Sequence, residues 1–271
     1  MDIGPAILLG IVQGVTEFLP ISSTGHLILA REVLGISDTN GLAIDAILHL
    51  ATAAAVLIYF RKDILRMGYA FLYRITGRPV PAEDERLLIL LVIATVPAVI
   101  LGLLLESYME TVFRSALFVA WGLIAGSLIF ILAEWVGKQY VEQESTPSKW
   151  RALVIGLFQS IALIPGMSRS GMTISGGMLL GLTREAAARF GFLLSFPIIL
   201  GSGSKKFLDL VSTGTLDTIG FSVLVAAVAA FISGIFAISF LMGFVKKHSL
   251  IPFAIYRIVL ALVVLWFIPM G

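Results

Sequence analysis

The chain of 271 residues contains no cysteine and few charged residues. The lack of cysteine excludes disulfides, thiolate catalysis and Cys-ligated metals, and it leaves the redox compartment open. Charged residues make up only 13% of the chain and hydrophobic residues 58%, whereas a soluble domain carries about a quarter charged residues. The net charge of +2 is too small to indicate a nucleic-acid partner. This composition indicates an integral membrane protein with little mass outside the bilayer.

Six apolar runs are long enough to cross a bilayer, whose hydrocarbon core takes about 20 helical residues. We interpret them as helices because an isolated strand leaves its backbone unsatisfied in lipid. The predicted spans cover residues 41–60, 86–106, 116–136, 184–203, 217–244 and 250–269. The sequence thus predicts an all-α polytopic membrane protein, with a basic amphipathic connection at 61–85.

Two further apolar stretches, 3–35 and 150–182, are interrupted in the middle by polar segments that contain proline and glycine. The interruptions read LPISSTG in the first stretch and IPGMSRSG in the second. Each half is too short to span a bilayer alone. This pattern is typical of a re-entrant helix–loop–helix, which is tolerated at membrane depth only where it lines a protein cavity. We therefore predict two re-entrant segments beside the six spans.

The two interrupted stretches align with each other when the chain is shifted by 146 residues. The shift superposes Gly10 on Gly156, Gln13 on Gln159, Ser22 on Ser168, Thr24 on Ser170 and Gly25 on Gly171. Three predicted spans separate the two copies, and an odd number inverts the second copy relative to the first. We predict one integral membrane domain over 1–271, built as an inverted repeat of about 1–136 and about 150–271.

The basic residues predict the orientation, because cytoplasmic loops carry an excess of Lys and Arg. Residues 61–86, 137–151, 184–189 and 246–247 hold 13 of the 19 basic residues. The opposite side holds only Arg31, Arg114, Lys205 and Lys206. Both termini are therefore expected to be extracytoplasmic.

The first interruption gathers groups suited to chemistry. Glu17 lies where a charge costs at least about 2.5 kcal/mol on insertion scales, and it shares a helix face with Gln13, four residues earlier. After the proline, a new helix is expected to begin at Ser22 or Ser23 as its N-cap, with His26 one turn inside. A hydroxyl, an imidazole and a carboxylate are candidates for a nucleophile, an acid/base and an orienting group.

The second interruption supplies an anion site. Ser168 can cap a helix that places Arg169 and Thr173 on one face. If both second half-helices point their N-termini at one place, their free N–H groups and positive dipole ends favour an anion there. The guanidinium of Arg169 adds a fork that matches phosphate. Together the interruptions predict a site for attack on a phosphoryl or acyl centre.

Plainer interpretations compete with this one. Buried hydroxyls often bond only to the backbone or to a neighbouring helix, and Glu17 with Arg169 can form a structural ion pair. His49 is interpreted as structural, with Asp45, four residues earlier on the same face, as its partner. Arg257 is expected to extend from its span toward the cytoplasmic interface.

The segments QGVTEFLPISSTGH and PGMSRSGMT resemble the two signature motifs of the undecaprenyl-pyrophosphate phosphatase family, also called bacitracin-resistance proteins. The likeness extends from GIVQG to IPFAIYR, which is nearly the whole chain. The resemblance implies hydrolysis of undecaprenyl pyrophosphate to the monophosphate and inorganic phosphate, which recycles the lipid carrier of cell-wall synthesis. It also implies a reaction on the outer face of the cytoplasmic (inner) membrane of a bacterium, and a divalent cation, Mg²⁺ or Ca²⁺.

The same resemblance implies roles for individual residues. The implied catalytic residues are Glu17, Ser23, His26 and Arg169, and the implied substrate-binding residues are Gln13, Ser22, Thr24, Ser168, Ser170 and Thr173. Gln13 and Glu17 match the family's (Glu/Gln)-x-x-x-Glu motif and are the implied metal ligands. An amide oxygen binds a hard cation but brings no negative charge, so Glu17 and the pyrophosphate would have to supply most of it.

Two other functions are kept as alternatives. Inverted repeats with broken helices are typical of secondary transporters, which suggests a transporter or flippase of a polyprenyl phosphate lipid. A transporter needs no nucleophile beside an imidazole, so Ser23 and His26 favour the enzyme. A non-enzymatic lipid-binding scaffold leaves the buried charges unexplained. The expected partners are the polyprenyl pyrophosphate substrate and membrane lipid, and association into a homo-oligomer is left open.

Overall fold

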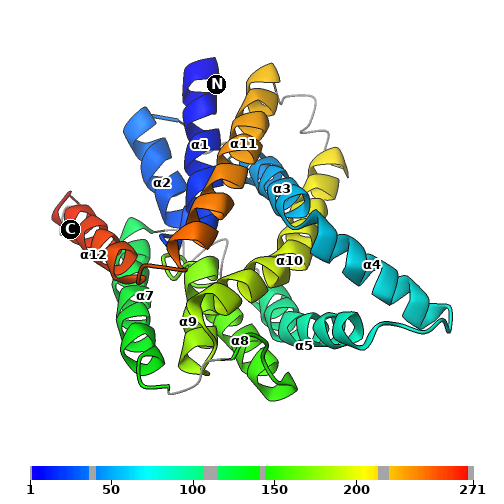
Figure 1. Cartoon of the computed structure of the whole chain (residues 1–271). Helices are drawn as coiled ribbons and strands as arrows, with labels where there is room; N and C mark the ends of the chain where they lie inside the picture. The colour runs from blue at the N-terminus through cyan, green and yellow to red at the C-terminus, as the bar shows by residue number, and fades with distance from the viewer. Residues whose placement is uncertain (1, 37–40, 106–114, 141–143, 213–219, 268–271) are drawn as a thin grey trace.

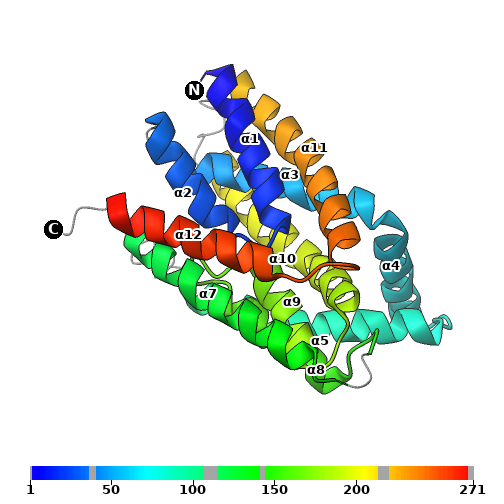
Figure 2. The same cartoon turned by 60° about the vertical axis from the view of Figure 1, so that its left-hand side comes forward.

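The structure is a computed structural model, and it describes residues 2–36, 41–105, 115–140, 144–212 and 220–267. The described residues form helices that are arranged as Figures 1 and 2 show. In chain order the helices are α1 Ile3–Phe18, α2 Ser23–Leu34, α3 Gly41–Tyr59, α4 Arg61–Ile75, α5 Ala82–Leu104, α7 Ala116–Gly137, α8 Lys149–Ile161, α9 Arg169–Leu179, α10 Arg184–Ser212, α11 Phe221–Phe244 and α12 Ile251–Phe267.

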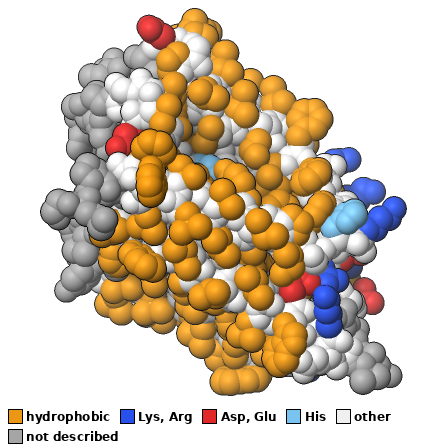
Figure 3. Space-filling view, turned by 90° about the vertical axis from the view of Figure 1, so that its left-hand side faces the viewer, with side chains coloured by type: hydrophobic (Ala, Val, Ile, Leu, Met, Phe, Trp, Pro, Cys, Tyr) orange, Lys and Arg blue, Asp and Glu red, His pale blue; other side chains and the backbone are white. Residues whose placement is uncertain are grey.

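The lengths and composition of the helices confirm a multi-pass membrane protein. Among the described residues, four helices (α5, α7, α10 and α11) are long and apolar enough to cross a bilayer, and α3 with α4 makes a fifth if this pair, bent by 90°, is counted as one span. Hydrophobic side chains cover most of the face shown in Figure 3, and Lys and Arg gather along one edge of it. The expected count of six spans is met only in part. Helix α4 begins at Arg61, directly after α3, so α3 counts as a span only together with it. Helix α12 has 17 residues, at the lower end of the spanning range.

Both interrupted stretches fold as two short helices joined by a break, as the sequence predicts. Residues 19–22 join α1 to α2, and residues 162–168 join α8 to α9. Ser22 and Ser168 are the N-caps of α2 and α9, with φ of 76° and 72°. Within the described part of the chain, these two are the non-glycine residues with positive φ, a conformation that strains any residue with a side chain. Because the 146-residue shift superposes them, the chain contains the same strained turn twice.

The first half-helix of each stretch packs against a long helix from the other half of the chain. Helix α1 lies against α11, and α8 lies against α5. A Cβ atom on Gly10 would overlap the carbonyl oxygen of Ala226, and one on Gly156 would overlap that of Ala94. Glycines at positions related by the shift thus permit both close approaches. The repeat boundaries themselves, about 1–136 and about 150–271, stay a prediction.

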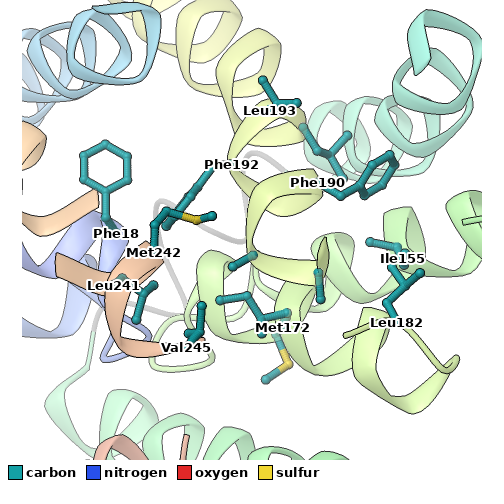
Figure 4. Close-up of a cluster of buried hydrophobic side chains, with 14 of the residues drawn as sticks. Phe18, Ile155, Met172, Leu182, Phe190, Phe192, Leu193, Leu241, Met242 and Val245 are labelled. Atoms are coloured by element: carbon teal, nitrogen blue, oxygen red, sulfur yellow. The ribbon is translucent and has the colours of Figure 1, made fainter. Parts of the chain in front are cut away.

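The largest hydrophobic core lies around the two breaks (Figure 4). Phe18, the last residue of α1, meets Phe192 of α10 edge to face, with ring centroids 5.8 Å apart. Met172 of α9 and Leu241 of α11 are buried in the same cluster. Since such close-packed interiors resist displacement, this core holds the end of α1 and the start of α9 in fixed positions.

The close approach of α1 and α11 can be tested by adding one methyl group. We expect Gly10→Ala to lower the free energy of unfolding by about 1–3 kcal/mol, because the methyl overlaps the Ala226 carbonyl. Thermal unfolding in detergent measures this change. The matched control is Gly243→Ala, also in a helix but with no atom within 4 Å of its Cβ position, which is expected to be neutral or to stabilise by up to about 1 kcal/mol. Equal effects of the two substitutions would contradict the close packing.

Candidate functional site

The carboxylate of Glu17 is the centre of the candidate site. Its side chain is only 3% exposed. One oxygen, Oε2, accepts hydrogen bonds from Ser23 Oγ at 2.7 Å and from Gln13 Nε2 at 3.1 Å. The other oxygen, Oε1, accepts from Nη1 of Arg169 at 3.1 Å. One buried carboxylate therefore joins residues of both interruptions, as the sequence predicts.

His49 of α3 also reaches this carboxylate, and sequence reasoning missed it. Its Nε2 lies 3.7 Å from Glu17 Oε2. The expectation that His49 pairs with Asp45 is wrong, because Asp45 forms an ion pair with Arg31 of α2. No local pattern around His49 pointed to the site. Its position follows from the packing of α3 against α11 and α1.

Two neighbouring cavities lie next to these groups. The smaller, of about 40 Å³, is lined by residues of both breaks and by His49, and it has room for only a few water molecules. The larger, of about 630 Å³, lies between α2, α3, α5, α8 and α10. Thr24, His49 and Arg169 line both cavities. Arg31, Lys205 and Lys206 also line the larger cavity.

The ten residues predicted for the site divide into two groups. Those that line the smaller cavity are Glu17, Ser22, Ser23, Thr24, Ser168 and Arg169. Gln13, His26, Ser170 and Thr173 line neither cavity. Ser170 Oγ donates to the carbonyl of Leu19 at 3.2 Å, and Thr173 Oγ1 donates to carbonyls of its own helix. These two hydroxyls brace the backbone around the cavity.

His26 is held by partners other than Ser23. Its Nδ1 lies 2.8 Å from the carbonyl oxygen of Ser22, and its Nε2 lies 2.7 Å from the hydroxyl of Tyr256 in α12. The two rings stack with centroids 5.7 Å apart. His26 therefore lies one turn inside α2, as expected, and links the first break to α12. The structure brings Ser23 to Glu17 rather than to His26.

Arg257 of α12 is fully buried, so the expectation that it extends to the interface is wrong. Its guanidinium donates to the carbonyls of Pro20 in the first break at 3.3 Å and of Met167 and Gly166 in the second at 3.1 and 2.8 Å. It also donates to two carbonyls of α7 and lies 4.4 Å from the ring centroid of Phe130. Broken helices leave carbonyls without intrahelical partners, and the five N–H donors of one arginine suit several of them at once.

The electrostatics of the smaller cavity favour an anion. The first residues of α2 and α9 both line it, and a helix N-terminus presents free N–H groups and a positive dipole end. Arg169 is the first residue of α9 and is 26% exposed on its side chain. One of its five donors is engaged by Glu17, which leaves others for a phosphate.

Glu17 and Gln13 are the two residues that the sequence motif implies as ligands of a divalent cation. Gln13 Oε1 is buried without a hydrogen-bond partner, and it belongs to the side chain that contacts Glu17. Among the described residues, no group of three or more His, Asp or Glu side chains gathers around a point suited to a metal. Magnesium is usually bound by one or two carboxylates together with substrate phosphates. Glu17 lines the smaller cavity and suits that mode as the single carboxylate, whereas Gln13 lines neither cavity and turns its amide nitrogen toward Glu17.

The structure thus defines a polytopic membrane protein in which two broken helices place a serine, a buried carboxylate and an arginine beside one cavity. The sequence profile of the bacitracin resistance protein BacA family matches residues 6–263. The chain belongs to this family.

Three relatives that match over nearly their full length have the same name. The Undecaprenyl-diphosphatase of Rubrobacter xylanophilus is 44% identical, with 97% of each chain covered. The protein of the same name from Chloroherpeton thalassium is 44% identical over 100% of this chain and 98% of its own. That of Alteromonas mediterranea is 41% identical over 99% of both.

The role of Arg257 in holding the breaks can be tested with a substitution that keeps its charge. Arg257→Lys replaces a fork that reaches carbonyls of three segments by one ammonium group. Because buried groups left unpaired cost about 1–3 kcal/mol each, we expect the free energy of unfolding to fall by at least about 2 kcal/mol, measured by thermal unfolding in detergent. Arg61→Lys, at an exposed arginine that bonds a single carbonyl, is the control and should change it by less than about 0.5 kcal/mol. A similar effect of both variants would show that Arg257 does not hold the breaks.

Proposed function

We propose that this protein is an undecaprenyl-diphosphatase, which hydrolyses undecaprenyl pyrophosphate to undecaprenyl phosphate and inorganic phosphate. The observation that supports this best is the Glu17 carboxylate, joined to Ser23 of one break and Arg169 of the other beside a small cavity. The names of its full-length relatives agree. The product is the carrier lipid of peptidoglycan precursors, so the reaction returns it for reuse and underlies bacitracin resistance.

In the proposed reaction, the terminal phosphate of the substrate occupies the smaller cavity. Ser23 Oγ attacks its phosphorus, or positions a water that does, and Glu17 takes the proton because its carboxylate already accepts from this hydroxyl at 2.7 Å. The bond from the terminal phosphorus to the bridging oxygen breaks, and this oxygen leaves on the lipid phosphate with the electron pair. Where Ser23 itself attacks, a water then adds to the phosphorus of the phosphoserine, the bond to Ser23 Oγ breaks, and that oxygen takes back the proton from Glu17 as inorganic phosphate leaves. Arg169 and the two helix N-termini stabilise the charge that develops on the terminal phosphate.

Two further groups are assigned proposed roles. His26 is proposed as a positioning residue, because it holds the carbonyl of Ser22, which precedes the nucleophile. This differs from the acid/base role that the resemblance implies. A divalent cation, Mg²⁺ or Ca²⁺, is proposed to be held by Glu17 together with the substrate, and Gln13 would join it if its amide turned to present Oε1. When bound, it would neutralise phosphate charge.

We also propose the setting of the reaction. The chain crosses the cytoplasmic membrane of a bacterium six times and carries two re-entrant segments, with both termini outside. The larger cavity takes the lipid end of the substrate. It extends toward Arg31, Lys205 and Lys206, which lie opposite the loops that hold most basic residues, and this supports entry from the outer face.

Phosphate release from a polyprenyl pyrophosphate by the purified protein in detergent tests the activity. We expect release that EDTA abolishes, and a loss of roughly a hundredfold or more in Glu17→Gln and in Arg169→Ala, because each removes a group that acts on the reacting phosphate. Arg61→Ala, at an exposed position, is the control for the lost arginine. If well-folded wild type binds the lipid but releases no phosphate, the enzymatic function is contradicted and the transporter becomes the favoured function.

The role of His26 is tested in the same assay by comparing two substitutions. We expect activity to be lost in His26→Ala and restored in part in His26→Gln, because an amide can still bond the Ser22 carbonyl and the Tyr256 hydroxyl. A positioning role thus predicts rescue by the conservative variant. Equal loss in both variants would favour proton transfer by the imidazole.

The absence of cysteine makes the orientation testable with single-cysteine variants. Ser145 and Ser212 are exposed and lie on opposite predicted sides. In intact spheroplasts, we expect a membrane-impermeant maleimide to label Ser212→Cys, whereas Ser145→Cys should react only after lysis. The cysteine-free parent is the background control. The reversed pattern would place the termini in the cytoplasm.

A further inference from the structure

Gln159 is a buried amide without a partner. It lies in the last turn of α8, immediately before the second break, and is only 2% exposed. Neither its Nε2 nor its Oε1 has a hydrogen-bond partner within the described part of the chain. Buried side-chain amides are nearly always paired, because desolvation without a hydrogen bond is unfavourable. Two unpaired polar atoms on one buried side chain therefore indicate that this side chain binds a ligand.

The corresponding residue in the first stretch shows what is missing. The 146-residue shift superposes Gln159 on Gln13, whose amide donates to Glu17 four residues later at 3.1 Å. The residue four positions after Gln159 is Leu163, which offers no side-chain acceptor. Helix α8 thus contains the same amide as α1, but it lacks the carboxylate that accepts a hydrogen bond from this amide in α1.

The position of Gln159 indicates which ligand it meets. It lines the larger cavity, together with Thr24, His49 and Arg169, and it does not line the smaller one. Arg169 lines both cavities, so it lies at the boundary between them. A diphosphate whose terminal phosphate sits beside Glu17 and Ser23 must lead its second phosphate past Arg169 into the larger cavity.

We propose that Gln159 binds the phosphate that stays on the lipid. This inference rests on the proposed function and assigns the leaving group a binding residue of its own. The amide nitrogen carries two N–H donors, and phosphate oxygens are strong, charged acceptors. As the bond to the bridging oxygen breaks, negative charge gathers on the retained phosphate, so a donor placed there stabilises the departing group.

The test compares two inhibitors of the purified protein in detergent: farnesyl monophosphate, which resembles the retained product, and inorganic phosphate, which resembles the released one. In Gln159→Leu we expect the inhibition constant of farnesyl monophosphate to rise about tenfold, as for loss of one hydrogen bond to a charged group. That of inorganic phosphate should not change. Ser160→Ala is the control, since this neighbouring buried hydroxyl bonds only the carbonyl of Gly156 and lines neither cavity.

A second variant keeps the test decisive where Gln159→Leu does not fold. Gln159→Glu has nearly the same shape but places a negative charge against the phosphate, so it should weaken farnesyl monophosphate more than the leucine variant does. Unchanged constants for both inhibitors in folded Gln159→Leu would mean that the amide holds only water, and would overturn the inference. An equal rise for both inhibitors would overturn it as well.

The phosphate-release assay tests the proposed function separately from the role of Gln159. Wild type that releases no phosphate from a polyprenyl pyrophosphate would sink the diphosphatase, whatever Gln159 does. Titration calorimetry with farnesyl monophosphate still tests Gln159 in that case, because it measures binding without turnover. Weaker binding to Gln159→Leu than to wild type and Ser160→Ala supports the inference, and equal binding to all three contradicts it.

Discussion

The guanidinium of Arg257 donates to carbonyls of both broken helices and of α7, and the site depends on this interaction. A helix that breaks in an apolar surrounding frees backbone groups that lipid cannot satisfy. The two strained N-caps, Ser22 and Ser168, adjoin the segments that Arg257 holds. Since such strain persists only where the surroundings impose it, the arginine fixes the turns that present Ser23 and Arg169.

The ion pair between Glu17 and Arg169 links the two breaks, and both of its partners have features that a structural pair does not need. A purely structural pair would use its partners fully, because each unpaired donor or acceptor adds to the cost of burying the charges. Here the carboxylate is also bonded by Ser23, and the guanidinium is partly exposed and lines both cavities. A phosphate that enters beside Arg169 meets free donors and a hydroxyl whose proton acceptor is already in place. The same contacts that hold these side chains in place would therefore also serve a bound anion.

Much of this site could be predicted from sequence because it is local. The breaks, the two serine N-caps and the contact of Gln13 with Glu17 follow from residues within a few positions of one another. The residues that were missed or misread, His49 and Arg257, reach the site from α3 and α12, far along the chain. Their positions are set by helix packing, which no local pattern specifies. The count of six spans was met only in part, because α3 counts as a span only together with α4 and α12 has 17 residues.

Two similar broken helices would by themselves make a site with two equal halves, and hydrolysis needs unequal ones. The chain achieves this by changing side chains on a repeated backbone. Ser23 and Arg169 are the first residues of α2 and α9 and occupy positions related by the 146-residue shift. One supplies a hydroxyl beside a carboxylate and the other an anion clamp, while Glu17 is superposed on Leu163. The hydroxyl and the positive charge therefore come from different halves of the repeat and meet at one carboxylate, so a phosphate bound by Arg169 would lie near the hydroxyl proposed to attack it.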